Sequence, residues 1–105
     1  MDRMFRLSLV VVSLIFALST WTFADAAADY KAKCATCHGP EGHGDTAMGK
    51  TMKVKDLSSD EVQKQSDADL TTIIDKGKKP MPGYEGKLTK EQIDGLVKYI
   101  RSLKK

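Results

Sequence analysis

Two cysteines and a histidine stand together in the run Cys34-Ala-Thr-Cys37-His38. In a C-x-x-C-H pattern the two thiols can add to the two vinyl groups of one porphyrin, because the two-residue gap keeps both sulfur atoms near one ring edge. The histidine follows directly, so its imidazole can swing under the ring and bind the iron. The chain has no other cysteine. The motif therefore predicts one covalently attached haem c, with Cys34 and Cys37 as thioether residues and His38 as an axial ligand.

Three other interpretations of these residues remain open. A bare C-x-x-C can be a thioredoxin-like redox pair, although that motif normally lies in a strand–helix–strand unit and no stretch here alternates like a strand. Structural zinc sites prefer a second ligand pair well downstream, and a plain disulfide could form if the chain is exported. The side chains available to zinc would be Cys34, Cys37, His38 and His43.

The first residues are typical of a secretory signal peptide. Two arginines precede an apolar run over residues 7–18, and small residues at 24–26 suit a signal peptidase. The apolar run is shorter than the roughly 20 residues that span a bilayer, which disfavours an uncleaved anchor. We expect a leader at 1–26, cleavage before Ala27, and a periplasmic domain at 27–105 without a membrane anchor. The tripeptide at 22–24 could direct the cut slightly earlier.

Few large side chains remain once such a leader is removed. All three phenylalanines and the only tryptophan lie within residues 1–26, which leaves three tyrosines as the aromatic residues of the mature chain. Domains this small usually need a covalent cross-link or a bound metal to be stable. A haem supplies a large apolar body around which side chains can pack. The poor core therefore supports the haem interpretation and predicts a poorly folded apoprotein.

The whole chain carries a formal net charge of +3, and residues 1–26 contribute two charges of each sign. The mature domain is therefore mildly basic. It has no long basic block and no interleaved aromatic residues, so nucleic acid is not an expected partner. Neither an internal repeat nor a linker is visible in the sequence. We expect one small domain that is a monomer.

Periodicity and capping patterns predict an all-α class. The predicted helices cover 27–37, a brief stretch opened by a capping box of Ser58 and Glu61, 66–76 and 89–103. Residues 45–57 give no clear pattern. The two prolines within 78–83 exclude a helix there.

The second iron ligand is predicted at Met81. Methionine opposite histidine closes the iron site for electron transfer and raises the reduction potential. Met81 lies between two prolines, outside any helix face, and the proline rings stiffen its loop. Met48 and Met52 follow His38 closely and are expected to stay on its side of the ring, and His43 is closer still.

With these motifs the chain resembles the class I c-type cytochromes, of the small monohaem bacterial and algal kind. The resemblance runs from about Ala27 to Leu103 and includes the haem motif near the mature N-terminus and the Met81-Pro82 loop. It implies a cytochrome c fold of short helices wrapped around one haem, with a small residue, Ala26 or Ala27, where the C-terminal helix crosses the first. The further matching positions are Tyr30, Leu96, Tyr99, Ile100 and Arg101.

Two features of that family are missing. Larger members have a proline about a dozen residues after the histidine, and its carbonyl accepts the imidazole N–H. That place falls near Lys50, and no proline is present. Another backbone carbonyl is expected to serve, because an axial histidine almost always has such a partner. The family's propionate-binding tryptophan also has no counterpart in the mature chain, so the sequence does not identify the residues that meet the propionates.

The resemblance implies a soluble periplasmic electron carrier rather than an enzyme. The alternative is a haem peroxidase or ligand sensor with a displaceable sixth ligand. That function usually needs a distal acid–base residue, and the neighbours of Met81 include none.

Redox partner proteins are expected to dock on lysines that flank the Met81 segment, because a positive rim would steer an acidic partner onto the haem edge. It is equally open that the lysines only keep the protein soluble. The residues concerned are Lys76, Lys78, Lys79, Lys87 and Lys90.

Overall fold

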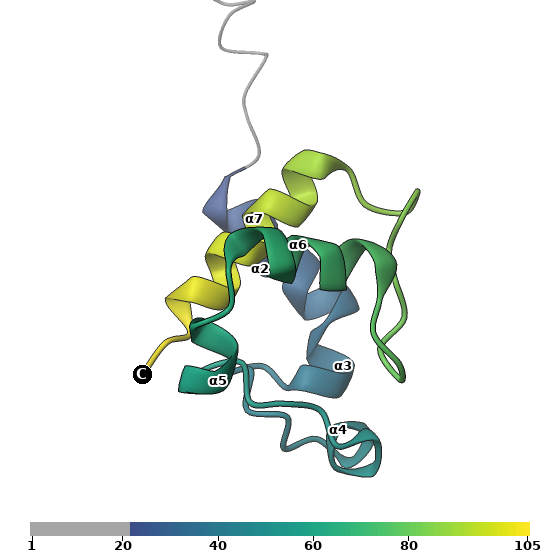
Figure 1. The fold of residues 1–105 in the computed structure, drawn as a ribbon, viewed down its shortest axis with the longest axis vertical. Coiled ribbons are helices and arrows are strands. Elements are labelled where there is room, and N and C mark those ends of the chain that lie inside the picture. Colours follow the sequence, from purple (N-terminus) through teal and green to yellow (C-terminus); the bar gives the residue numbers. More distant parts are fainter. Residues whose placement is uncertain (1–21) are drawn as a thin grey trace, which may run out of the picture.

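The computed structural model describes residues 22–105, so most of the predicted leader lies outside it. The described part contains helices and a single isolated bridge, between Lys78 and Met81 (Figure 1). The predicted all-α class is confirmed. None of the helices within 22–105 is long and apolar enough to cross a membrane. The helices are α2 (Phe23–Lys33), α3 (Ala35–His38), α4 (Ala47–Met52), α5 (Asp60–Gln63), α6 (Asp67–Lys76) and α7 (Lys90–Ser102).

Serine and threonine side chains begin every one of these helices except α3. In each case the hydroxyl oxygen accepts a hydrogen bond from the backbone N–H three residues later, which satisfies one of the free donors of the first turn. The predicted caps at Ser66 and Thr89 are confirmed, and Gln92 completes a capping box on α7. The capping residues are Thr22, Thr46, Ser59, Ser66 and Thr89.

The predicted capping box of Ser58 and Glu61 is wrong. α5 is capped by Ser59, whose hydroxyl accepts from the Val62 N–H at 3.4 Å. The Ser58 side chain is buried and donates to the Asp56 carboxylate at 2.6 Å. Glu61 forms an ion pair with Lys55. Either of the two adjacent serines could cap α5. Because Ser58 binds Asp56, Ser59 is the residue that caps the helix.

The predicted helix over 27–37 is also corrected, because two helices cover this region. α2 begins at Phe23, where Thr22 and Asp25 form a reciprocal capping box. It ends before Cys34, where a short turn leads into α3, and Gly39 at φ 83° then ends α3. The first helix therefore extends further toward the N-terminus than predicted, and the C-x-x-C-H run lies on a separate turn.

Residues 45–57, which gave no clear pattern, contain α4. This helix packs closely on the end of α3, because a Cβ atom on Gly49 would collide with the carbonyl oxygens of Cys37 and Gly44. The Thr46 hydroxyl donates to the Cys37 carbonyl at 2.9 Å and fixes the same contact. Gly49 and the Thr46 hydroxyl thus hold α4 closely against the C-x-x-C-H turn.

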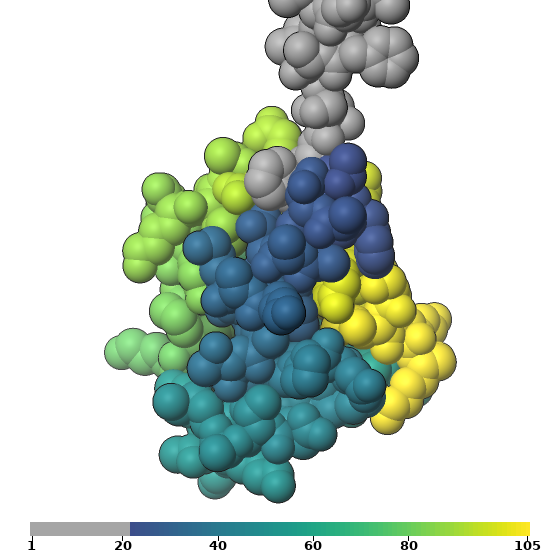
Figure 2. Space-filling model, turned by 180° about the vertical axis from the view of Figure 1, so that it is seen from behind, coloured from purple at the N-terminus to yellow at the C-terminus, as the bar shows by residue number. Residues whose placement is uncertain are grey.

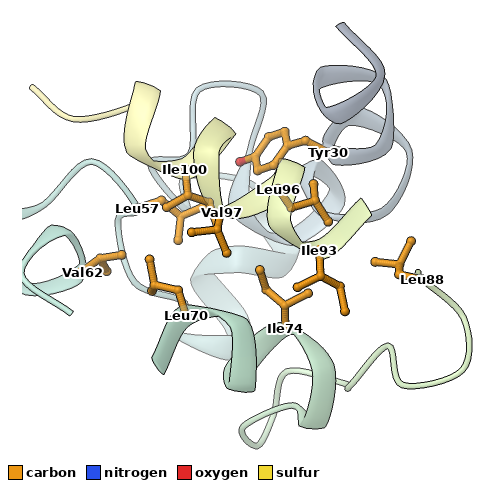
Figure 3. Packing of buried hydrophobic residues seen from close by; sticks show 10 residues of the cluster. All are labelled: Tyr30, Leu57, Val62, Leu70, Ile74, Leu88, Ile93, Leu96, Val97 and Ile100. Carbon is orange, nitrogen blue, oxygen red and sulfur yellow. The ribbon is translucent and has the colours of Figure 1, made fainter. Parts of the chain in front are cut away.

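The core lies where α2 crosses α7 and where α6 packs beneath α7 (Figures 1 and 3). The Tyr30 ring of α2 lies 4.7 Å from the Tyr99 ring of α7, between centroids. Ala26, one turn before Tyr30, is completely buried, so Ala26 is the small residue at the crossing. Figure 3 shows Leu70 and Ile74 of α6 pointing toward the buried face of α7.

Candidate cofactor site

A cavity of about 220 Å³ lies within the described residues, between the C-x-x-C-H turn, α6, α7 and two loops. Its volume is far larger than the space that a single water molecule needs. Because its walls are mostly apolar, it suits a flat apolar body better than a cluster of waters. The aliphatic residues in these walls are Val54, Leu57, Val62, Leu70, Ile73, Ile74, Leu96 and Ile100.

The structure brings three of the four predicted site residues to this cavity. Cys34 and His38 line it from the first turn, and Met81 lines it from the loop after α6. The fourth, Cys37, is half-buried beside His38 but does not line the cavity. Residues that are far apart in the sequence therefore meet at one apolar surface.

The C-x-x-C-H spacing follows from one turn of helix. The backbone N–H groups of Cys37 and His38 both donate to the Cys34 carbonyl, at 3.2 and 2.9 Å. Residues three and four apart lie on the same side of a helix, so Cys37 and His38 come back to the side of Cys34. The Tyr30 hydroxyl donates to the Gly39 carbonyl at 2.7 Å and ties the end of this turn to the core.

The surroundings of Cys34 disfavour a thioredoxin-like redox pair. Both cysteines are free, and burial, assisted by the nearby Asp29 carboxylate, raises the pKa of Cys34 to about 11. A redox-active cysteine has a lowered thiol pKa, because the thiolate is the reactive form. Cys34 therefore lacks the electrostatic surroundings of a thioredoxin-like nucleophile.

Zinc is disfavoured by the positions of its four proposed ligands. Within residues 22–105, no three side chains of histidine, cysteine, aspartate or glutamate gather as a metal site would require. His43 turns toward Asp56, with its Nδ1 atom 3.2 Å from the carboxylate. Of the interpretations that the sequence left open, covalent haem attachment agrees best with this arrangement.

His38 is held in the form that a metal ion requires. Burial lowers its pKa, and the nearby Lys55 backbone acts in the opposite direction, as a carbonyl oxygen facing the ring would. The Nδ1 atom is buried and has no hydrogen-bond partner within bonding geometry among the described residues. A neutral imidazole is the ligand form of histidine. The Lys55 carbonyl is thus the candidate for the role that a proline carbonyl has in the larger cytochromes that this chain resembles.

A tight loop holds Met81 at the cavity. Lys78 and Met81 exchange two backbone hydrogen bonds, at 3.1 and 2.8 Å. At the base of the loop Gly77, at φ 81°, and Gly83 approach so closely that a Cβ atom on Gly77 would lie 2.6 Å from the Gly83 nitrogen. The Tyr84 N–H donates to the carbonyl of Ile74 in α6 at 3.0 Å. These contacts leave the loop little freedom.

The other two methionines of the described chain differ in position. Met48 is 48% exposed and lies away from the cavity, whereas Met52 lines it. Met52 belongs to the segment that also brings Lys55 to the cavity. Both Met52 and Met81 thus place a thioether in this region, and Met52 must be tested beside Met81.

The lysines around the cavity are only partly those predicted. Lys78 and Lys79 line its edge, whereas Lys87 and Lys90 are exposed elsewhere. Lys76 forms an ion pair with Glu85 at 2.7 Å. The α4–α5 segment adds two lysines that the sequence did not indicate, because they lie far from Met81 along the chain. These are Lys53 and Lys55.

Comparison with known proteins identifies the family. A family model described as cytochrome c oxidase, cbb3-type, subunit III matches residues 22–100. The chain is 32% identical to cytochrome c6 of Synechococcus sp. over 98 residues, covering 90% of this chain and 85% of the relative. The chain belongs to the class I c-type cytochromes.

Other similarities agree with this family assignment. Cytochrome c6 of Microcystis aeruginosa is 33% identical over 76 residues, which cover 72% of this cytochrome and 90% of the relative. The solved structure of the KustC0563 c-type cytochrome has a TM-score of 0.71 and 32% identity, covering 76% of this chain and 98% of the other. Family membership implies haem c and its iron as the cofactor. The apolar cavity, the free thiols and the His38 imidazole, whose pKa is lowered by burial, fit that group.

A carboxylate network supports the cavity wall of the cytochrome. Asp56 lies between Lys55 and Leu57, which both line the cavity, and it accepts hydrogen bonds from the Ser58 hydroxyl at 2.6 Å and the Ser58 N–H at 2.9 Å. His43 Nδ1 lies 3.2 Å from the same oxygen. Mainly through the Ser58 hydroxyl, these contacts lower the pKa of Asp56 to about 2.

The Asp56 network predicts a pH dependence of stability. The pKa of Asp56 is about 2 in the folded state against 3.8 for a free aspartate, so the folded protein binds the proton less readily. The stabilisation is fully present above about pH 4 and is lost as the pH falls through about 2. In acid titrations followed by circular dichroism, Asp56→Asn should lose this part of the pH dependence. Asp94→Asn, at an exposed position on α7, is the control, and equal curves for both variants would contradict the assignment.

Proposed function

We propose that the cytochrome is a periplasmic, monomeric carrier of single electrons, exported by its N-terminal leader. In this proposal Cys34 and Cys37 hold one haem by thioether bonds, and His38 and Met81 are the axial ligands of its iron. The proposal rests chiefly on the presence of His38 and Met81 at one apolar cavity. The relatives named cytochrome c6 support the electron-carrier class.

When bound, the haem would supply a one-electron couple at its iron. The residues of the chain would exclude water from it with apolar walls and keep its ligands in place. Burial lowers the pKa of His38, which leaves a neutral imidazole available as a ligand. The short loop closed by Gly77 and Gly83 would keep the Met81 thioether in place in both oxidation states. Little rearrangement during electron transfer is what a carrier requires.

The alternative function, a haem peroxidase or a ligand sensor, has less support. Such a site usually needs an acid–base side chain near the open iron position. Of the described histidine, aspartate and glutamate residues, His38 alone lines the cavity. The Tyr30 hydroxyl, which also reaches this region, donates to the Gly39 carbonyl. The polar residues of the Met81 loop that line the cavity are Lys78 and Lys79.

Covalent attachment predicts a specific mass. Protein matured in a host with haem-attachment machinery should carry one haem that survives acid–acetone extraction, because thioether bonds resist it. Intact mass spectrometry measures this directly. A double Cys34→Ala, Cys37→Ala variant should release its haem under the same extraction. An unmodified wild-type mass with bound zinc would contradict the proposal.

The axial pair predicts a difference among the three methionines. Met81→Ala should abolish the weak sulfur–iron band in the red region of the ferric spectrum, lower the reduction potential and create carbon monoxide binding. Met48→Ala is the exposed control, and Met52→Ala is the control within the cavity. Both should keep the low-spin spectrum. Loss of the band in Met52→Ala with retention in Met81→Ala would transfer the ligand role to Met52.

The proposed docking surface is the lysine rim, defined here as Lys53, Lys55, Lys78 and Lys79. All four line the cavity, so an acidic partner on this rim would come close to the haem edge. Lys55 is partly neutralised by its ion pair with Glu61. Lys78 and Lys79 are exposed and adjoin the Met81 loop, and they are the best positions for a test.

Charge reversal on the rim should slow electron transfer. Lys78→Glu or Lys79→Glu should lower the association rate with the natural partner, and Lys104→Glu, near the C-terminus, should change it less. Stopped-flow rates of the wild-type protein should fall as salt rises, because exposed charges are screened within about 8–10 Å at physiological ionic strength. Rates that are indifferent to salt, or equal effects of all three variants, would leave the rim a role in solubility only.

A further inference from the structure

The boundary between leader and mature domain can be placed from the packing of α2. Ala26 is completely buried, whereas Ala24 and Phe23 are exposed, the latter to 55%. Figure 2 shows the start of α2 lying against the C-terminal helix α7. Ala26 and Tyr30 are the buried residues of α2 and lie one turn apart on the same face. The part of the chain that the core requires therefore begins between residues 24 and 26.

A cut between Ala26 and Ala27, as the small residues at 24–26 suggested, would remove a core residue. It would also shorten α2 to residues 27–33 and put the new ammonium group at the N-terminus of the helix, where a positive charge is unfavourable. The buried face of α7 at the crossing would lose the residue that covers it.

A cut between Ala24 and Asp25 keeps the buried Ala26 and leaves α2 residues 25–33 in place. Thr22 and Ala24 then occupy the third and first positions before the cut, where a signal peptidase accepts small residues. Thr22, Phe23 and Ala24 are all exposed, so their removal takes away no buried residue, although it loses the contact of the Phe23 ring with Tyr99, 5.6 Å between centroids. Asp25 becomes the first residue, and its carboxylate at the N-terminus of α2 offsets the new ammonium group. The Thr22 cap is lost, but the crossing at Ala26 is kept.

We infer that leader processing occurs between Ala24 and Asp25, so that the mature cytochrome begins at Asp25 and retains Ala26 in its core. The inference depends on the proposed export and revises its boundary from residue 27 to residue 25. It concerns the processing site only, and haem ligation is independent of it.

N-terminal sequencing and intact mass of the periplasmic holoprotein, expressed as the full chain, test the inference. The expected first residue is Asp25. A first residue of Ala27, any other start, or a retained leader would overturn the inference. The haem content of the same sample is read from its mass and spectrum. A wrong start with haem attached refutes the processing site alone, and an uncleaved chain without haem also refutes the proposed export.

Two variants sharpen the test. Ala24→Leu places a bulky side chain next to the proposed cut and should abolish the product that begins at Asp25, leaving the precursor or the product that begins at Ala27. Ala28→Leu, at an exposed position of α2, should leave processing unchanged.

Holoprotein made to begin at Ala27 behind a foreign leader should melt several degrees below holoprotein that begins at Asp25. Equal melting temperatures, or unchanged processing in Ala24→Leu, would overturn the inference.

Discussion

The crossing of α2 over α7 positions the rest of the structure. The rings of Tyr30 and Tyr99 meet there, and such a pair contributes about 0.5–1.5 kcal/mol beyond the area it buries. The same tyrosine that packs on α7 donates its hydroxyl proton to the Gly39 carbonyl, a buried bond worth about 1 kcal/mol net. Because Gly39 ends the turn that carries Cys34 and His38, the crossing fixes the side of the cavity that these two residues line.

The other side of α7 positions the opposite part of the fold. The Arg101 guanidinium donates to the carbonyls of Gln63 and Gln65 and pairs with Asp67, at 2.5–3.0 Å. These bonds fix the corner between α5 and α6, and Gln65 itself lines the cavity. Since α6 leads directly into the Met81 loop, the segments that carry the two proposed ligands, His38 and Met81, are both positioned by α7. A small domain with few aromatic residues can hold two distant segments in register in this way.

The sequence predicted the parts of the site that depend on local spacing. Cys34, Cys37 and His38 share one helical turn, and the periodic apolar residues of α7 reflect one buried face, so both could be found without a structure. The cap of α5 could not, because Ser58 and Ser59 fit the pattern equally well and the choice depends on Asp56. Met52 ends the short helix α4, and Lys53 and Lys55 follow it on a loop, so no periodicity in the sequence shows that these residues reach the cavity. The start of α2 was misplaced because an apparent cleavage motif overlaps a helix.

The Met81 loop combines two requirements in adjacent residues. Its backbone is closed by the hydrogen bonds between Lys78 and Met81 and by the close approach of Gly77 and Gly83. The side chains of Lys78 and Lys79 stand at the cavity edge from this same short loop. A partner that contacts these lysines therefore contacts the segment that carries the proposed axial ligand. A rigid loop would keep the Met81 thioether in place. It would also limit how far a docked partner can displace that thioether.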